Sequence, residues 1–234
     1  MAVDLTVVQD GHYLRRQQLP EEVASYVREL IISGNAGPGE FLRMERIAEA
    51  VGVSNTPVRE GLLLLRSEGF VTQIPRRGFV VAPFTRQDVK DLFWAQAVLS
   101  GELAARAATK ITAEQITHLA DNMELYERAV TDEDSNAVEN LGHEFHREIN
   151  RAADSRRLSL LLNSVVKHMP NRFYANIVGQ VAGTRTEHPL LVEALREGQA
   201  GRARELMEQH ISSGAERLIE MLEERGLWKV VVQS

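Results

Sequence analysis

The chain of 234 residues contains no cysteine, which excludes a disulfide framework and any metal site built from thiolates. It also lacks an uninterrupted run of about eighteen apolar residues, the length that a membrane-spanning helix needs. Its first residues do not combine a basic stretch with a long apolar run, so the sequence predicts no signal peptide. Together these absences predict a protein of the cytoplasm.

An excess of positive charge is also missing, because 33 acidic residues outnumber 27 lysines and arginines and the net charge is -6. This balance argues against indiscriminate binding to nucleic acid. The charge is unevenly distributed, however, since residues 41–80 carry six arginines and four glutamates. A DNA-binding surface needs only a local excess of positive charge, and this segment provides one.

The first third of the chain has the pattern of a small helical fold. Residues 1–18 show no sustained period and are expected to form a loose arm. A helix is predicted to open at Leu19 and Pro20, because proline suits the first turn of a helix, and to end at residues 33–35. A second, shorter helix is predicted to end at Gly52.

A third helix is predicted directly after Ser54, which is a good N-cap residue. Two β-prone runs, residues 70–74 and 79–81, then flank a turn that contains proline and glycine, which predicts a hairpin. Three helices followed by a hairpin form a winged helix-turn-helix, and we assign this fold to residues 19–82.

The start of the third predicted helix and the tip of the hairpin carry the candidate DNA contacts. In helix-turn-helix proteins the second helix of the motif enters the major groove by its N-terminus, where short polar side chains reach phosphates and an arginine reaches guanine. A capped helix start with an arginine is also common on ordinary solvated helices, so the preceding helix and the hairpin decide the interpretation. The residues predicted to contact DNA are Arg43, Arg46, Ser54, Asn55, Thr56, Arg59, Arg76, Arg77 and Gly78.

From residue 83 onward the pattern is helical, with no convincing strand. Predicted helices cover residues 86–109, 112–131, 135–151, 154–168, 186–198 and 201–225. Thr85, Thr112, Asp154 and Thr186 are expected to cap helices, and Thr112 with Gln115 forms a capping-box pattern. We therefore predict an all-α helical bundle over residues 83–226, followed by an apolar tail at residues 227–234. The predicted fold class is mainly α.

Specific segments resemble a known family. GVSNTPVREGL (52–62) resembles the recognition segment GVSRTPVREAL of the GntR family of bacterial transcription regulators. LSGELAARAA (99–108), FHREINRAADSRRL (145–158) and EHPLLVEALREGQAGRARELMEQHI (187–211) resemble its FCD subgroup, whose all-helical domain senses small molecules. The resemblance implies a homodimer that binds operator DNA and responds to a metabolite, an organic acid in relatives.

Two departures affect the DNA-reading half. Asn55 replaces the arginine that is usual in the family, and Glu45 stands where the preceding helix usually has another arginine. Arg43 or Arg46 is left to take the place of that second arginine. The operator sequence therefore cannot be transferred from relatives.

The FCD resemblance also implies a metal site. Many members hold a divalent ion through one aspartate and three histidines, and the matching positions here are His146, His188 and His210. Neutral imidazoles suit zinc or nickel. The position of the aspartate is Gly142, which cannot ligate, and the adjacent His143 is displaced by about 100° around the helix. Without the resemblance, histidines at helical spacing are more often packed core residues.

Near these histidines we predict four ligand-binding residues, Gln96, His143, Asn150 and Arg172, with Tyr174 as a further candidate. Gln96 and Ser100 stand where the family often has an arginine and a glutamate. The missing arginine weakens the expectation that the pocket clamps a carboxylate in the usual way. Arg106 is expected to face solvent or an ion pair, and His12, His118 and His168 are expected to be surface or core residues.

Three alternatives to a metal-dependent sensor remain at this stage. A pocket without metal could bind an organic anion through the same histidines. A metal-dependent enzyme is conceivable, since three histidines with an open position can activate water, but the sequence shows no positioned general base and no Ser/His/Asp set. A helical scaffold without a ligand would also explain the second domain.

Overall fold

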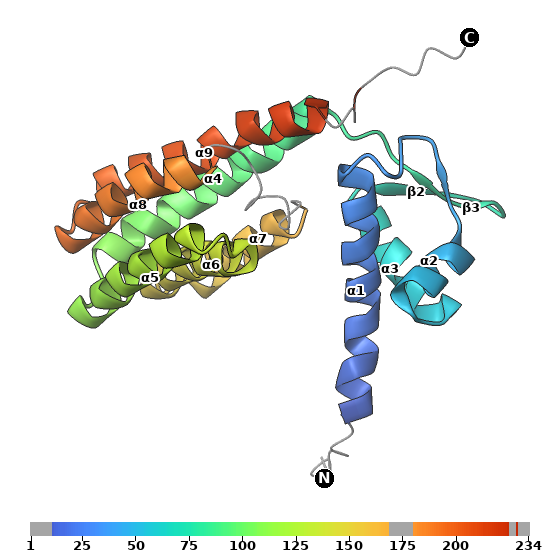
Figure 1. Cartoon of the computed structure of the whole chain (residues 1–234), viewed down its shortest axis with the longest axis horizontal. Helices are drawn as coiled ribbons and strands as arrows, with labels where there is room; N and C mark the ends of the chain where they lie inside the picture. The colour runs from blue at the N-terminus through green and yellow to red at the C-terminus, as the bar shows by residue number, and fades with distance from the viewer. Residues whose placement is uncertain (1–10, 169–179, 225–227, 229–234) are drawn as a thin grey trace. The chain divides into compact units, whose positions relative to one another are not determined.

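The computed structural model describes residues 11–168, 180–224 and 228 of the chain (Figure 1). The chain divides into two compact units, of which the first ends at Phe84 and the second begins at Thr85. Arg172 and Tyr174, predicted near the ligand, lie outside the described residues. None of the described helices combines the length and the apolar character that crossing a membrane requires.

The N-terminal unit contains three helices and a three-stranded antiparallel sheet. Its elements are α1 (Gly11–Ile32), β1 (Phe41–Leu42), α2 (Met44–Val51), α3 (Asn55–Ser67), β2 (Val71–Ile74) and β3 (Gly78–Val81). The strand order is β1-β3-β2. The order of helices and hairpin agrees with the predicted winged helix-turn-helix. Strand β1 was not predicted, because two residues are too few to show a periodic pattern.

Helix α1 begins at Gly11 and contains Pro20 in its interior, whereas the sequence pattern predicts a start at Leu19. The loose arm predicted for residues 1–18 is therefore wrong for residues 11–18. A proline inside a helix removes one hydrogen bond and disfavours the turn before it, but the helix can continue through it. The preference of proline for the first turn consequently placed the predicted start too late.

Helices α1 and α3 pack closely, and Gly61 makes this approach possible. A Cβ atom at position 61 would lie 2.7 Å from the carbonyl oxygen of Pro20 and 2.8 Å from a methyl carbon of Val23. Around this contact, Val27, Val58 and other apolar side chains are fully buried. The close contact positions the start of α3, where four of the predicted DNA contacts lie.

The C-terminal unit is all helical over its described residues, as the sequence predicts. It contains α4 (Arg86–Ala108), α5 (Ala113–Thr131), α6 (Ser135–Ala152), α7 (Arg156–Val166), α8 (Gln180–Arg196) and α9 (Ala200–Glu224). Helix α4 runs beside α9 (Figure 1) and also contacts α6, α7 and α8. Its buried residues include Phe93 and Leu103. Helix α4 is therefore central to the bundle.

Two of the four predicted helix caps are present and two are wrong. Thr85 and Thr112 both form capping boxes, with Asp88 and Gln115 respectively. Asp154 instead adopts a positive φ of 49°, and Ser155 is the N-cap of α7. Thr186 lies inside α8, where its hydroxyl donates to the carbonyls of Ala182 and Gly183. A threonine can satisfy its hydroxyl this way within a helix, so its presence alone does not mark a helix start.

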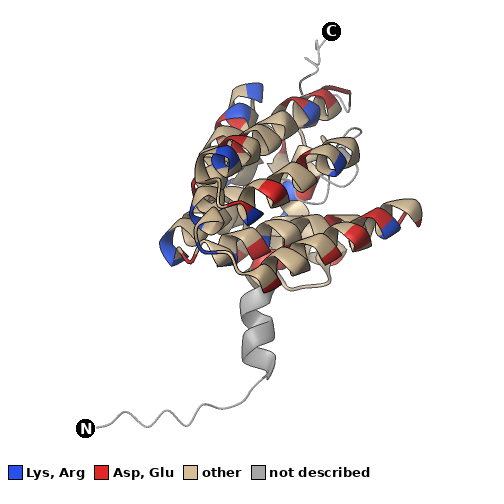
Figure 2. Ribbon diagram, turned by 90° about the vertical axis from the view of Figure 1, so that its left-hand side faces the viewer, with Lys and Arg blue, Asp and Glu red and all other residues tan. Residues whose placement is uncertain are grey.

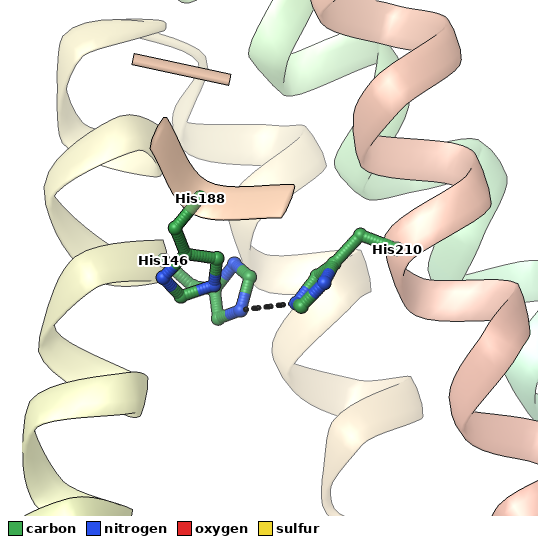
Figure 3. Close-up of side chains that lie close together, drawn as sticks. All are labelled: His146, His188 and His210. Carbon is green, nitrogen blue, oxygen red and sulfur yellow. Dashed lines mark hydrogen bonds between the residues drawn. The ribbon is translucent and has the colours of Figure 1, made fainter. Parts of the chain in front are cut away.

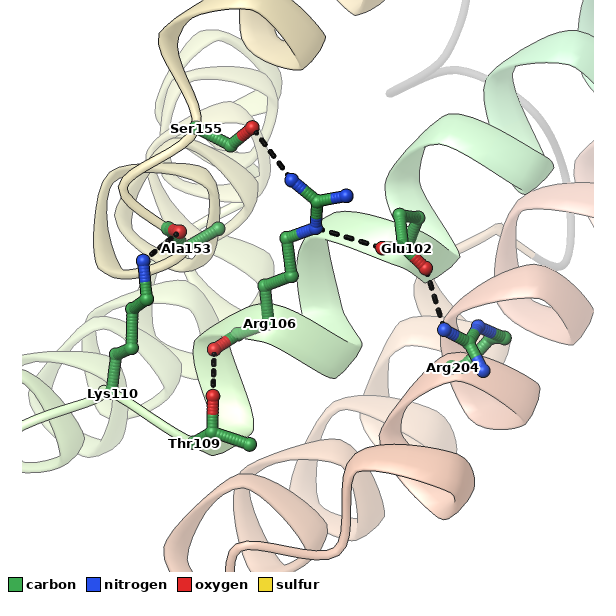
Figure 4. A network of polar contacts seen from close by, with 7 residues as sticks. All are labelled: Glu102, Arg106, Thr109, Lys110, Ala153, Ser155 and Arg204. Carbon is green, nitrogen blue, oxygen red and sulfur yellow. Dashed lines mark hydrogen bonds and ion pairs between the residues drawn. The ribbon is translucent and has the colours of Figure 1, made fainter.

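A network of charged side chains connects α4 to its neighbours (Figure 4). Arg106 donates to Glu102 at 2.7 Å and to the Ser155 hydroxyl at 3.1 Å, and Arg204 of α9 donates to Glu102 at 2.5 Å. The hydrogen bonds from both arginines lower the pKa of Glu102. Arg106 thus lies in an ion pair, as expected. Acidic and basic residues are interspersed over the helices of this unit (Figure 2).

Candidate functional site

All nine residues predicted to contact DNA are exposed on the N-terminal unit. They occupy three places, namely the start of α2 (Arg43, Arg46), the start of α3 (Ser54, Asn55, Thr56, Arg59) and the tip of the hairpin (Arg76, Arg77, Gly78). Ser54 is the N-cap residue of α3, but its side chain makes no capping hydrogen bond. Its hydroxyl therefore stays available at the positive end of the helix dipole.

Four of these arginines have no protein partner for their guanidinium groups among the described residues, namely Arg43, Arg46, Arg59 and Arg76. Elsewhere in the same unit, by contrast, Arg28 is buried and its Nη2 atom lies 2.5 Å from Oε2 of Glu68. An exposed arginine without an acidic neighbour keeps its full charge and all its donors for an external anion. This pattern suits a surface that binds phosphate groups.

The fifth predicted arginine, Arg77 at the hairpin tip, has an aromatic neighbour. The guanidinium carbon of Arg77 lies 4.8 Å from the ring centroid of Phe41, a favourable cation–π distance. Phe41 belongs to β1 and is paired with Val80 of β3. Sequence analysis missed this contact because it depends on the pairing of a strand that has no sequence signal of its own.

In the C-terminal unit, the three predicted histidines come together from three helices (Figure 3). His146 lies on α6, His188 on α8 and His210 on α9, and one ring nitrogen from each lies within 4.8 Å of the others. Nε2 of His146 is 3.3 Å from Nε2 of His210. The ring of His188 stacks on Phe145 with a centroid distance of 3.8 Å. His188 and His210 are buried and His146 is half-buried, and Nε2 of His188 has no hydrogen-bond partner among the described residues.

Glu187 orients one of these imidazoles. The Nδ1 atom of His210 lies 2.6 Å from Oε2 of Glu187. With Nδ1 donating its proton to this carboxylate, Nε2 presents its lone pair to the centre of the cluster. Sequence analysis did not assign this role, because Glu187 and His210 are 23 residues apart and lie on different helices.

Burial disfavours the charged forms of His146 and His188. It lowers the pKa of His146 and of His188 well below the usual value, and the neighbouring His210 lowers both further. The hydrogen bond from His210 lowers the pKa of Glu187. At neutral pH His146 and His188 are therefore neutral, which is the form that binds a metal ion.

The geometry fits a divalent ion in part. Two nitrogens that share a tetrahedral zinc ion at about 2.0–2.1 Å lie about 3.3–3.4 Å apart, and the Nε2 atoms of His146 and His210 are 3.3 Å apart. The unpartnered Nε2 of His188 provides a third donor. His143 is not part of the group, and its Nε2 atom lies 3.7 Å from Glu139. Gly142 supplies no ligand.

A cavity of about 340 Å³ adjoins the histidines. It is lined by all three of them and by three of the four predicted ligand-binding residues, namely Gln96, His143 and Asn150. Ser100 also lines it and is buried without a hydrogen bond to the described protein. The cavity has the size and the mixed polar and apolar lining of a small-molecule site.

Comparisons with known proteins agree with this organisation. Residues 19–81 match the family of bacterial regulatory proteins named gntR, and residues 91–213 match the FCD domain. The chain is 25% identical to an uncharacterized HTH-type transcriptional regulator, YdhC, of Bacillus subtilis over 85% of this chain and 90% of that protein. It is 30% identical to the Glc operon transcriptional activator of Escherichia coli over 69% of this chain and 71% of that protein.

A solved structure supports the same fold. McbR/YncC of Escherichia coli superposes with a TM-score of 0.64 at 21% identity and covers 88% of this chain and 98% of its own. The two matched regions fall on the winged helix-turn-helix and on the histidine-containing bundle. The chain therefore belongs to the GntR family of bacterial transcription regulators and carries an FCD domain.

Proposed function

We propose that this regulator binds operator DNA through its N-terminal unit and that a small molecule in the histidine-lined cavity controls its affinity for DNA. The observation that carries this proposal is a buried imidazole cluster, with an unpartnered nitrogen on His188, beside a cavity of about 340 Å³. A buried polar atom without a partner is costly. Its retention here is explained if an ion or ligand satisfies it.

For DNA, the proposal assigns the contacts to the nine exposed residues named above. The unpaired guanidinium groups of Arg43, Arg46, Arg59 and Arg76 support it. A protein that reads chromosomal operators acts in the bacterial cytoplasm, and we assign it there. Gel-shift titrations with the DNA upstream of its own gene, at two salt concentrations, test the assignment. Binding that is independent of salt would contradict phosphate contacts.

For the cavity, we propose that His146, His188 and His210 bind one zinc or nickel ion. Three protein ligands leave positions open for an effector, as in metal sites that exchange ligands. A carboxylate of an organic acid suits such positions. Glu187 would hold His210 in the ligating tautomer, the usual role of a carboxylate that accepts a hydrogen bond from the other ring nitrogen of a metal-bound histidine. Relatives of similar length are named as transcription regulators, so we propose a sensing ion and not a catalytic one.

Metal analysis of the purified chain tests this assignment, and Gly142→Asp sharpens it. A Cβ atom at position 142 would have the ring of Tyr126 as its nearest neighbour, at 4.0 Å, so an aspartate fits. Since Gly142 precedes His146 by one helical turn, the new carboxylate would lie on the same helix face. We expect it to raise zinc affinity about tenfold or more. An unchanged affinity would place the ion elsewhere.

We also propose that the regulator acts as a homodimer, because two winged helices related by a twofold axis match the symmetry of paired operator half-sites. The effector would bind the two dimer arrangements with different affinity and so change operator binding. Sedimentation at micromolar concentration is expected to show a dimer. A monomer that binds a full palindrome tightly would overturn this part of the proposal.

A further inference from the structure

The cavity beside the histidines contains hydrogen-bonding groups that the protein itself does not use. Ser100 on α4 is 5% exposed, and no hydrogen bond satisfies its hydroxyl within the described chain. Several other helical hydroxyls, such as those of Thr117 and Ser159, donate to a carbonyl four residues earlier. The hydroxyl of Ser100 makes no such bond although the residue is buried, and Ser100 lines the cavity.

Two carboxamides share this property. Gln96 precedes Ser100 by one turn of α4, and Asn150 follows His146 by one turn of α6. Both line the same cavity, both are half-buried, and neither side chain has a hydrogen bond to the described protein. Residues four positions apart lie on one face of a helix. The cavity is therefore lined both by the imidazole cluster and by an uncharged set of donors and acceptors.

The charged side chains that line the cavity already have neighbours within the protein. Among the described lining residues, the arginine is Arg147, whose Nη2 atom lies 2.6 Å from Glu144, and the carboxylate is Glu139, which faces His143. A carboxylate placed against Gln96, Ser100 and Asn150 would lose its hydration without meeting an opposite charge, which is costly. A hydroxyl group, in contrast, can donate to and accept from carboxamides and a serine hydroxyl without that penalty.

We infer that Gln96, Ser100 and Asn150 form a hydroxyl-binding subsite, so that the effector is a small polyhydroxylated acid with a single carboxylate and not a dicarboxylate or a fatty acid. This inference rests on the proposed function for the role of the effector. The carboxylate lies toward the histidines, and the hydroxyl-bearing carbons lie against the subsite. Apolar lining residues such as Leu162 and Ile211 contact the carbon chain.

Three six-carbon probes separate these possibilities by isothermal titration calorimetry on the full chain. Gluconate carries one carboxylate and several hydroxyls, hexanoate carries one carboxylate and no hydroxyl, and adipate carries two carboxylates and no hydroxyl. We expect gluconate to bind at least about tenfold more tightly than either of the others. Adipate or hexanoate binding as tightly as gluconate, or gluconate failing to bind, would overturn the subsite.

Variants of the cavity residues test which side chains cause the preference for gluconate. Ser100→Ala and Gln96→Met remove hydrogen-bonding groups with little change in volume, and each should weaken gluconate binding about five- to tenfold, in line with the loss of one or two hydrogen bonds. Binding of hexanoate should change less than twofold. The matched control is Gln87→Met on the same helix, because Gln87 is exposed and bonds to Asp91, and it should leave all three affinities unchanged. An equal loss for every probe would show a structural effect and contradict the subsite.

The same titrations in the presence of a chelator distinguish this inference from the proposed metal. All three affinities should fall when the ion is removed, while the order of the probes stays the same, because the subsite does not depend on the ion. A chain that binds no zinc but keeps the order would overturn the metal and support the subsite. A chain that binds zinc and operator DNA but does not bind gluconate more tightly than hexanoate and adipate would overturn the subsite alone.

Discussion

The two units of this regulator differ in the share of their arginines that form ion pairs. In the N-terminal unit, the guanidinium groups of Arg59 and three other exposed arginines have no protein partner among the described residues. In the C-terminal unit, many arginines are paired, for example Arg151, Arg185 and Arg204. Unpaired guanidinium groups suit binding to a polyanion, whereas paired ones hold helices together. The net charge of -6 conceals this division.

The units also differ in what they bury. In the N-terminal unit the one buried charged side chain among the described residues, Arg28, pairs with Glu68. The C-terminal unit buries His188 and His210, and Nε2 of His188 has no hydrogen-bond partner among the described residues. The unpaired polar groups of the first unit are therefore exposed on its surface, whereas the unpartnered nitrogen of His188 in the second unit is buried. Four predictions test this contrast.

The largest effect is expected from the interior site. His188→Ala or His210→Ala should reduce zinc affinity about 100-fold or more, because two imidazoles remain. Zinc at about 100 times its dissociation constant should stabilise the native chain by about 2.7 kcal/mol, which corresponds to roughly 5–10 °C in Tm for a chain of this size. Both variants should lose that increment.

Thermal unfolding with and without a chelator measures this difference. His118→Ala is the matched control, since His118 is exposed on α5 and outside the cluster. It should keep the full response to zinc. If the chelator leaves the Tm of the native chain unchanged and metal analysis finds no ion, the metal is excluded and the cavity binds an organic ligand alone.

The second effect concerns the surface. Arg59→Ala should weaken binding to the native operator by about 1–3 kcal/mol if the side chain reads a base. Arg77→Ala should weaken binding to all sequences more evenly and should flatten the salt dependence. Neither should change the free energy of unfolding by more than about 0.5 kcal/mol. Gel shifts on operator and scrambled DNA decide between these roles, and unchanged binding in both variants would remove the winged helix as the DNA-binding surface.

The third effect is a pH dependence of the metal-free protein. In the folded state the pKa values of His146 and His188 are lowered, whereas in the unfolded chain they return to about 6.5. Below pH 6.5 the unfolded state therefore binds more protons, and stability falls as the pH falls. The loss should reach about 2 kcal/mol between pH 7 and pH 5.5.

Urea unfolding of chelator-treated protein at the two pH values measures this loss. His146→Asn should remove about half of it, because one of the two buried imidazoles is absent. A free energy of unfolding that does not change between pH 7 and pH 5.5 would show that these imidazoles are hydrated in solution.

The smallest effect is expected from the paired charges of the C-terminal unit. Glu102→Gln breaks the ion pairs with Arg106 and Arg204. Because these side chains are substantially exposed, the loss should be less than about 1 kcal/mol. Operator affinity in the absence of effector should be unchanged, in contrast to Arg59→Ala. A large loss of DNA binding in Glu102→Gln would break the division of roles between the two units.

Local patterns in the sequence predicted much of the fold correctly. The helical periodicity of residues 86–109 predicted α4 to within one residue, and the capping box at Thr112 predicted the start of α5. The start of α1 and the cap at Thr186 were wrong, because proline and threonine are tolerated inside helices when the surrounding turns are stable. Preferences at helix ends are weak compared with the stability of a whole helix.

The sequence by itself determined the order of helices and hairpin, and through its resemblance to a family it indicated which three histidines meet. Only the tertiary structure decided how each polar group is used. Whether a histidine is buried, whether Glu187 reaches His210, and whether Ser100 lacks a partner all depend on contacts between helices. Burial raises the cost of an unsatisfied or charged group and lowers the dielectric around it. Such effects arise from packing, and no local pattern of residues encodes them.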